Sequence, residues 1–282
     1  YPTFKSDESF FDYYKWLYDI IILTKTNILI MDMRDGLKRK ELFLLKKNTG
    51  VKVVTIDDPE NKRCEADLAF YPPVPQLKKM NWDGFFGKVF VGWKYVIVRD
   101  EFMHKYPSAN NSKPNILVSM GATDKSNMTK FVFDVLNKIK HKFVVTAILG
   151  AGYKLKEQNN IFSKEVHHFE YDIHYNPDNV ANIMSSTDLA IISFGQTAYE
   201  IAALNIPAIY LCLTDDHNLS SKIFANKNLG KSAGVFDNNR EETEKNLEKY
   251  LNMFLCNFPP KKARKINFDL KNISKPIMSI LS

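Results

Sequence analysis

Short runs of hydrophobic residues alternate with segments of helical periodicity along most of the chain. In the first third, apolar runs that predict buried strands lie at residues 27–32, 51–56, 66–70 and 89–98. Between the first two runs, leucines recur at helical spacing over residues 36–47, and Gly50 ends that helix.

The same alternation resumes after residue 115. Strands are predicted at 116–120, 143–149, 189–193 and 207–213, and helices at 126–140, 180–186, 196–204, 219–228 and 240–255. Buried strands that alternate with helices form parallel sheets covered on both faces. We therefore predict an α/β fold.

A polar segment with two prolines, KYPSANNSKPN at residues 105–115, separates the two series. It has almost nothing to bury and is typical of a linker. We predict two Rossmann-like domains, residues 1–108 and 109–265, followed by a C-terminal segment, 266–282. We expect the first domain to be partial, because no strand–loop–helix unit opens it.

The composition is that of an ordinary soluble globular protein, since 45% of the 282 residues are hydrophobic and 25% are charged. This balance excludes disordered chains and small disulfide-stabilised proteins. The net charge of +7 comes from scattered lysines. We therefore expect no nucleic-acid partner, because a small phosphorylated ligand accounts for the charge equally well.

Cysteine usage and apolar runs bear on location. Cys64, Cys212 and Cys256 lie far apart and form no CxxC pair, which favours a reducing compartment and speaks against structural zinc or a disulfide framework. The apolar stretch 20–23 is too short to cross a bilayer, and no basic segment of a signal peptide precedes it. We expect a cytoplasmic protein without stable membrane insertion.

The loop after the predicted strand 116–120 has the residues of an anion site. Gly121 permits a tight turn, and the N–H groups of Ala122 and Thr123 lie where a helix begins, a position that attracts phosphate. Thr123 or Asp124 can equally act as a helix cap. Both interpretations of this loop stay open.

A second loop of this kind follows the strand 189–193. Ser193 and Thr197 supply hydroxyl groups, Gly195 permits close approach, and Gln196 opens a helix whose N-terminus is the positive end of its dipole. Glu200, one turn further, can accept hydrogen bonds from two ribose hydroxyls or can simply compensate the dipole. Two such loops in one domain favour a site for a nucleoside diphosphate.

Other polar groups follow predicted strands. Asp216 and His217 follow the strand 207–213 and are expected to face the same cleft, although they also fit an Asp-rich helix cap. In the first domain we assign Asp32, Arg34 and Asp57 to the cleft. Paired carboxylates such as Asp57-Asp58 can do acid–base work or hold Mg²⁺. We favour helix capping and ion pairs with Arg34 or Lys38, and we expect no metal site.

These loops, in this order, resemble those of the UDP-sugar hydrolases of bacterial nonulosonic (pseudaminic) acid biosynthesis and the related spore coat polysaccharide biosynthesis proteins. The similar segments are Asp57-Asp58 with Ala66-Asp67, GWKYVIVRDEF at 92–102, Met120–Asp124, and 193–207, which matches the family pattern G-x-T-x-x-E that holds UDP. The resemblance implies two Rossmann-like domains in a GT-B arrangement, with residues 266–282 returning to the first domain. It also implies a UDP-sugar substrate and no cofactor.

The chain departs from this family at several positions. The family's first strand ends in a G-x-G-H loop that carries the proposed catalytic base, whereas the only G-x-G here is Gly150-Ala151-Gly152. Ala122 stands in place of a glycine, Arg34 in place of a tyrosine, and Asp216-His217 in place of an Asn-Gln pair.

The resemblance implies a hydrolase in which water attacks the anomeric carbon of a UDP-sugar and UDP leaves. Without the family histidine, His217 beside Asp216 is the best candidate base, and we expect residues 1–282 to bind UDP with negligible turnover. Two alternatives remain. One is a GT-B glycosyltransferase, and the other is a non-catalytic UDP-sugar-binding module of a larger polypeptide, with a nucleotidyltransferase domain as a partner.

Overall fold

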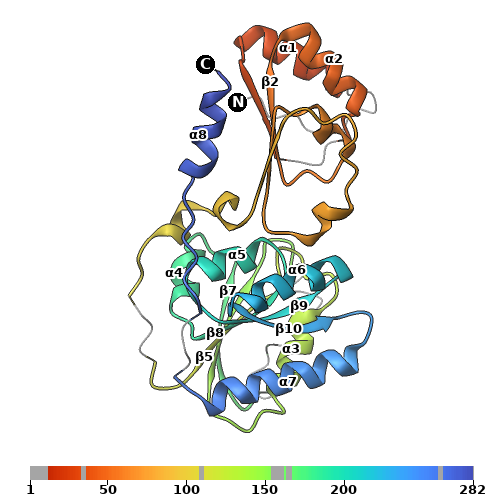
Figure 1. The fold of residues 1–282 in the computed structure, drawn as a ribbon. Coiled ribbons are helices and arrows are strands. Elements are labelled where there is room, and N and C mark those ends of the chain that lie inside the picture. Colours follow the sequence, from red (N-terminus) through yellow and green to blue (C-terminus); the bar gives the residue numbers. More distant parts are fainter. Residues whose placement is uncertain are drawn as a thin grey trace. The chain divides into compact units, whose positions relative to one another are not determined.

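A computed structural model describes residues 12–32, 36–107, 111–153, 162, 167–259 and 263–281. These residues form two compact units (Figure 1). The first unit contains the described residues up to Val96 together with those from Asp269, and the second contains Ile97–Phe268. The division falls before the polar segment 105–115 because residues 97–102 pack on a helix of the second unit, as described below.

The first unit is built on a parallel sheet. Its strands run in the order β1-β2-β3-β4 and comprise β1 (Ile28–Met31), β2 (Lys52–Ile56), β3 (Leu68–Tyr71) and β4 (Lys88–Val91). Helices α1 (Tyr13–Thr24) and α2 (Arg39–Thr49) bury leucines and isoleucines against one face of this sheet. Helix α8 (Lys271–Ser279) contacts β3.

Local chemistry sets the ends of these elements. The Asp12 carboxylate accepts a hydrogen bond from the Lys15 N–H at 3.0 Å and caps α1. Gly50 ends α2 in the left-handed conformation. The strand predicted at 89–98 ends at Val91 instead, because Gly92 takes a positive φ of 128° and a 3-10 turn, η3 (Trp93–Tyr95), follows. Three more such turns are η1 (Asn61–Glu65), η2 (Pro75–Lys79) and η4 (Asp100–Met103).

The second unit is a six-stranded parallel sheet in the order β10-β9-β8-β5-β6-β7. The strands are β5 (Asn115–Ser119), β6 (Val144–Leu149), β7 (Glu170–Tyr175), β8 (Leu189–Ser193), β9 (Ala208–Cys212) and β10 (Gly230–Val235). The helices are α3 (Met128–Leu136), α4 (Val180–Ser185), α5 (Gln196–Ala203), α6 (Asp215–Asn226) and α7 (Arg240–Cys256).

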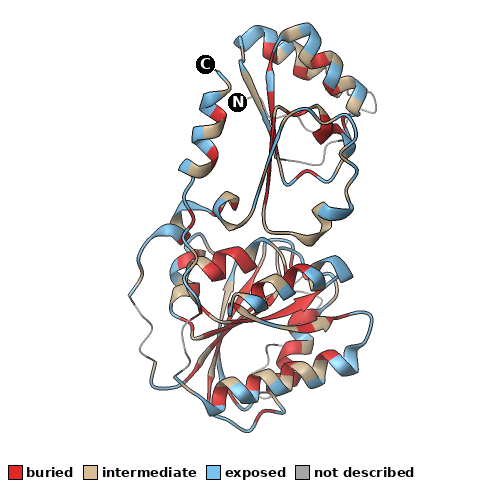
Figure 2. Ribbon diagram, viewed as in Figure 1, coloured by how far each residue is buried: buried red, intermediate tan, exposed pale blue. Residues whose placement is uncertain are grey.

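Helices lie on both faces of this sheet, with α3 and α7 on one face and α5 and α6 on the other. The central strands are almost wholly buried (Figure 2). The predicted α/β fold with parallel sheets is therefore confirmed. Because β5 has β6 on one side and β8 on the other, the strand order reverses there, and the loops after β5 and β8 flank the switch point where such sheets bind ligands.

No helix in the described part of the chain combines the length and the apolar character needed to cross a bilayer.

Candidate functional site

The loops after β5 and β8 lie side by side. The two strands pair in parallel, with Ser119 opposite Ile192, so both loops leave the same edge of the sheet. A Cβ atom built on Gly121 would lie 3.5 Å from the Ser193 Oγ. Gly121 also has a φ of 81°, which a side chain would strain. The two loops that the sequence predicted to bind phosphate, after β5 and after β8, are thus adjacent.

The loop after β6 supports the first of them. The Gly152 N–H donates to the Ala122 carbonyl at 2.9 Å. A Cβ atom on Gly150 would lie 2.4 Å from the Ala122 Cα, so any side chain there displaces the loop. The G-x-G sequence at 150–152 therefore packs closely against Ala122 and supports its loop. This packing role was not predicted from the sequence.

Asp124 turns inward and caps helix α3. Its two carboxylate oxygens accept hydrogen bonds from the N–H groups of Met128, at 2.8 Å, and Thr129, at 2.9 Å. Burial raises the pKa of this carboxyl group, and the helix hydrogen bonds oppose the shift. The loop was predicted either to bind an anion or to cap a helix, and Asp124 acts as a helix cap. Anion binding here would rest on Gly121 and on the exposed Ala122 and Thr123.

Helix α5 begins without a side-chain cap. Its N-cap residue, Gly195, has extended backbone, and open space surrounds the position of a Cβ atom there. In contrast, Thr214 caps α6 and Asn239 caps α7 with side-chain hydrogen bonds. The first N–H groups of α5 are therefore available to a ligand beside Ser193 and the half-buried Thr197.

The side chain of Gln196 points elsewhere. Its Nε2 donates to the Ile97 carbonyl at 2.8 Å and ties the start of α5 to the segment that opens the second unit. A phosphate contact from Gln196 would therefore come from its backbone N–H.

Glu200 is paired with an arginine that the site prediction did not include. The Glu200 side chain is 6% exposed, and its Oε1 accepts from the Arg99 Nε at 3.0 Å. Arg99 also pairs with the Glu101 Oε1 at 2.8 Å, and its guanidinium lies 4.8 Å from the centroid of the Phe102 ring. Arg99, Glu101 and Phe102 were visible in the sequence as part of the family-like segment 92–102, but the segment alone gave them no partner.

His217 lies next to the loop after β8. Its ring centroid is 6.0 Å from that of Phe194, and its backbone N–H donates to the Oγ1 of Thr214, the N-cap residue of α6, at 3.2 Å. The Nδ1 atom is buried and has no hydrogen-bond partner among the described residues. Burial lowers the pKa of this histidine, and the neighbouring Asp216 opposes the shift. The neutral form, which a general base requires, is thus favoured at neutral pH.

The first-unit residues assigned to the cleft are only partly described. Asp32 and Asp57 are exposed, and Arg34 lies outside the described residues. Asp58 is buried, and its Oδ2 lies 3.6 Å from the Lys62 Nζ. An ion pair was the favoured interpretation of this carboxylate. Among the described residues its partner is Lys62, four positions along the chain in the turn η1, rather than Lys38. Nowhere in the described ranges do three His, Cys, Asp or Glu side chains cluster as a metal site would require.

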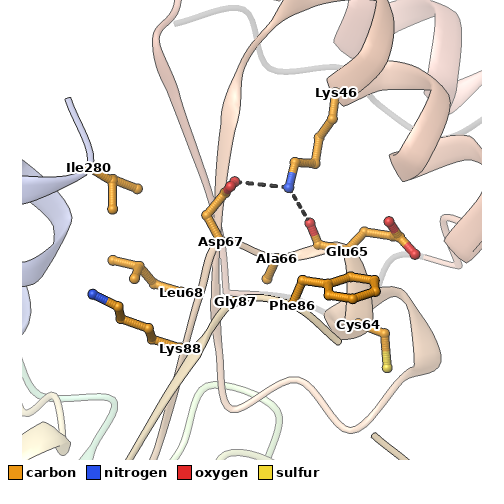
Figure 3. Close-up of a pocket in the computed structure, with 10 residues that line it drawn as sticks. All are labelled: Lys46, Cys64, Glu65, Ala66, Asp67, Leu68, Phe86, Gly87, Lys88 and Ile280. Atoms are coloured by element: carbon orange, nitrogen blue, oxygen red, sulfur yellow. Dashed lines mark hydrogen bonds and ion pairs between the residues drawn. The ribbon is translucent and has the colours of Figure 1, made fainter. Parts of the chain in front are cut away.

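A pocket of about 270 Å³ lies in the first unit at the amino ends of β3 and β4 (Figure 3). Two of its charged groups pair with each other, since the Lys46 Nζ lies 3.0 Å from the Asp67 Oδ2. Lys46 also donates to the Glu65 carbonyl at 2.6 Å, and the Glu65 carboxylate pairs with Arg39. The pocket is at the opposite end of the strands from the ligand-binding edge of a parallel sheet. We assign no site to it.

Comparison with known proteins begins at the sequence. No family model matches the chain. An uncharacterised protein of Methanocaldococcus jannaschii is 33% identical over 128 residues, which are 43% of this chain and 26% of that protein. The UDP-2,4-diacetamido-2,4,6-trideoxy-beta-L-altropyranose hydrolase of Campylobacter jejuni is 25% identical over 231 residues, 80% of each chain. The match thus spans about a quarter of the first relative and four fifths of the second.

Solved structures are similar over most of the chain. MurG of Acinetobacter baumannii has a TM-score of 0.59 at 15% identity and covers 86% of this chain and 69% of its own. The spinosyn rhamnosyltransferase SpnG with thymidine diphosphate has a TM-score of 0.54 at 14% identity, covering 87% and 69%. The Methanocaldococcus jannaschii UDP-GlcNAc 2-epimerase with UDP-GlcNAc and UDP has a TM-score of 0.59 at 12% identity, covering 95% and 79%. The chain is therefore an α/β protein of the GT-B fold.

Proposed function

We propose that the second unit binds the UDP portion of a UDP-sugar. The observation that carries the proposal is the uncapped N-terminus of α5 beside the Gly121–Thr123 loop, with a buried carboxylate, Glu200, one turn further along the helix. Uncapped helical N–H groups suit phosphate, and an ionised carboxylate suits a pair of ribose hydroxyls. The likeness to the Campylobacter jejuni hydrolase, whose name specifies a UDP-sugar, supports uracil as the base.

The reaction we propose is hydrolysis of the UDP-sugar in nonulosonic acid or cell-surface polysaccharide biosynthesis. Water attacks the anomeric carbon, the bond from that carbon to the phosphate oxygen breaks, and UDP leaves with the bonding electron pair. The helix N-terminus would stabilise the charge that develops on the leaving phosphate. A base must take a proton from the attacking water, and His217 is the candidate that this chain offers.

The binding step is tested by isothermal titration calorimetry with UDP. A micromolar dissociation constant is expected, which corresponds to about −8 kcal/mol. UDP-GlcNAc and thymidine diphosphate serve as comparison ligands, because the proposal requires a preference for the uridine nucleotide. Absence of both heat and a thermal shift at millimolar UDP would contradict the proposal.

Two other functions use the same site. The likeness to a rhamnosyltransferase favours glycosyl transfer. A non-catalytic sugar-nucleotide-binding module is favoured by the Methanocaldococcus jannaschii relative, because the match covers only 26% of that longer protein. A nucleotidyltransferase domain would be the partner of such a module. Product analysis separates the three, since hydrolysis yields free sugar in water, transfer needs an added acceptor, and a binding module releases no UDP from either mixture.

A further inference from the structure

We infer that Arg99 is a positioning residue that holds the Glu200 carboxylate in a fixed orientation for the ribose of the nucleotide. The inference rests on the proposed function, because it needs a nucleotide at the switch point of the second unit. Arg99 would not itself touch the nucleotide.

The burial of Glu200 makes a partner necessary. Its side chain is 6% exposed, and a carboxylate withdrawn from water is costly unless it is paired and hydrogen-bonded. The Arg99 Nε supplies that partner at 3.0 Å. The Oε2 atom takes no hydrogen bond from the described residues and keeps its capacity to accept.

Arg99 is itself held in place from two directions. Glu101 pairs with its Nη1 at 2.8 Å, while the Phe102 ring lies under its guanidinium at 4.8 Å. Phe102 is 1% exposed, so the ring is a fixed support. Although the Arg99 side chain is 53% exposed, these contacts limit its rotamers and make the Nε position reproducible.

The segment that carries Arg99 is also anchored. The Gln196 side chain, at the start of α5, donates to the Ile97 carbonyl at 2.8 Å. The Tyr106 hydroxyl donates to the Glu101 carbonyl at 2.9 Å. The arginine and the carboxylate therefore sit on two elements that are joined at a second point, which is the arrangement expected of a preorganised site.

The test compares binding of UDP and 2′-deoxyUDP, since the ratio of the two affinities reports the hydrogen bond to the 2′-hydroxyl. In the unaltered chain we expect UDP to bind roughly tenfold to hundredfold more tightly. Arg99→Ala should bring the ratio to about that of Glu200→Gln, and the affinity for 2′-deoxyUDP, which keeps only the 3′-hydroxyl, should fall less than the affinity for UDP. Arg99→Lys should give an intermediate ratio, because an ammonium lacks the planar fork.

A matched control is available in the same unit. Arg240 also stacks on a phenylalanine, with its guanidinium 4.6 Å from the Phe236 ring centroid, and pairs with Asp237. Arg240→Ala should leave the ratio unchanged. If Arg99→Ala unfolds because Glu200 is left buried and unpaired, the double variant Arg99→Ala/Glu200→Gln removes that charge, and its ratio should equal that of Glu200→Gln alone.

Each remaining outcome overturns the inference. An unchanged ratio in Arg99→Ala means that Arg99 does not position Glu200. An equal loss of UDP, 2′-deoxyUDP and inorganic phosphate means that Arg99 contacts the phosphates directly. A normal ratio in Glu200→Gln removes the ribose role while UDP binding stands. Absence of UDP binding in the unaltered chain is a different result, and it rejects the proposed function as well.

Discussion

Two buried carboxylates, Asp124 before α3 and Glu200 within α5, have different roles at the residue scale. Asp124 bonds the N–H groups of its own helix, whereas Glu200 bonds an arginine 101 positions away along the chain. The same residue types serve helix caps and ligand sites, so sequence alone left both interpretations open for each. Only the partner atoms distinguish them.

Glu200→Gln should weaken UDP binding roughly tenfold to hundredfold, because a charge-assisted hydrogen bond becomes a neutral one. Affinity for inorganic phosphate should not change, since the proposed phosphate site is at the N-terminus of α5 and not at Glu200. Calorimetry with both ligands measures the two effects. Glu244→Gln, which removes a surface partner of Lys138 on α7, is the control. Normal UDP affinity in Glu200→Gln would reject the ribose role.

Asp124→Ala should lower the free energy of unfolding by about 1 kcal/mol through loss of the α3 cap. Asp124→Asn should retain most of the stability, because an amide oxygen still accepts one of the two hydrogen bonds. Urea denaturation of the three proteins measures this. Equal stability of the Ala and Asn variants would show that the cap contributes nothing.

His217 should make stability depend on pH. Its pKa in the folded chain is lowered by burial, so the unfolded chain binds more protons below the ordinary histidine value of about 6.5. The stabilisation is fully present above that pH and is lost as the pH falls. His217→Gln should flatten this part of the profile between about pH 7.5 and 5.5, measured by urea denaturation. The exposed His104→Gln is the comparison, and an identical slope in both variants would contradict the assignment.

At the scale of elements, α5 differs from α6 and α7 in having no side-chain cap. Gly195→Asp should supply one, since the backbone is extended and nothing obstructs a Cβ atom there. We expect stability to be equal or higher by a few tenths of a kcal/mol, and UDP affinity to fall more than about tenfold, because the new carboxylate competes for the N–H groups and repels phosphate.

Gly195→Ala is the matched variant for this experiment, since it adds a Cβ atom without an acceptor or a charge. It should bind UDP nearly normally. If Gly195→Asp binds UDP as well as Gly195→Ala does, the phosphates do not lie at the start of α5. Thermal unfolding in the absence of nucleotide reports the stability part of the prediction.

The pattern of apolar residues predicted the four strands of the first sheet and the central strands of the second, and it missed the two edge strands of the second sheet, β7 and β10. Strand β10 has the sequence GKSAGV, which contains too few apolar residues to be predicted as a strand. It forms a strand because it pairs with β9. Helices α1 and α8 were not predicted as helices, and the predicted helix 126–140 is shorter, from Met128 to Leu136. Helix α6 begins earlier than predicted because Thr214 caps it at Asp215.

The candidate site likewise contains residues that the sequence predicted and contacts that it did not. Glycines and hydroxyl residues after strands are visible in sequence, because each loop is a local motif. The contact between Arg99 and Glu200 depends on how distant segments pack and has no local signal. The closeness of Gly121 to Ser193 likewise follows from β5 pairing with β8 rather than from either loop.

At the scale of the whole molecule, residues 1–282 should bind UDP but release almost no UDP from UDP-sugars. The chain contains no G-x-G-H segment, and His217 is its best substitute base. Chromatographic detection of UDP from UDP-N-acetylated sugars measures the rate against a protein-free blank. Substantial hydrolysis would refute the expectation, and its loss in His217→Ala would then identify His217 as the base.

The strand order of the two sheets has a consequence for how the polypeptide acquires its structure. In the first sheet every strand pairs with the next strand along the chain. In the second sheet β5 also pairs with β8, which lies far along the chain, since Ile116 pairs with Leu189. Local pairings form faster than distant ones. During synthesis the first sheet can therefore assemble early, but α8, which packs on β3, is made after all of the second unit. One face of the nascent sheet therefore stays without α8 until the whole second unit has been synthesised, which is the interval when a chaperone would be most useful.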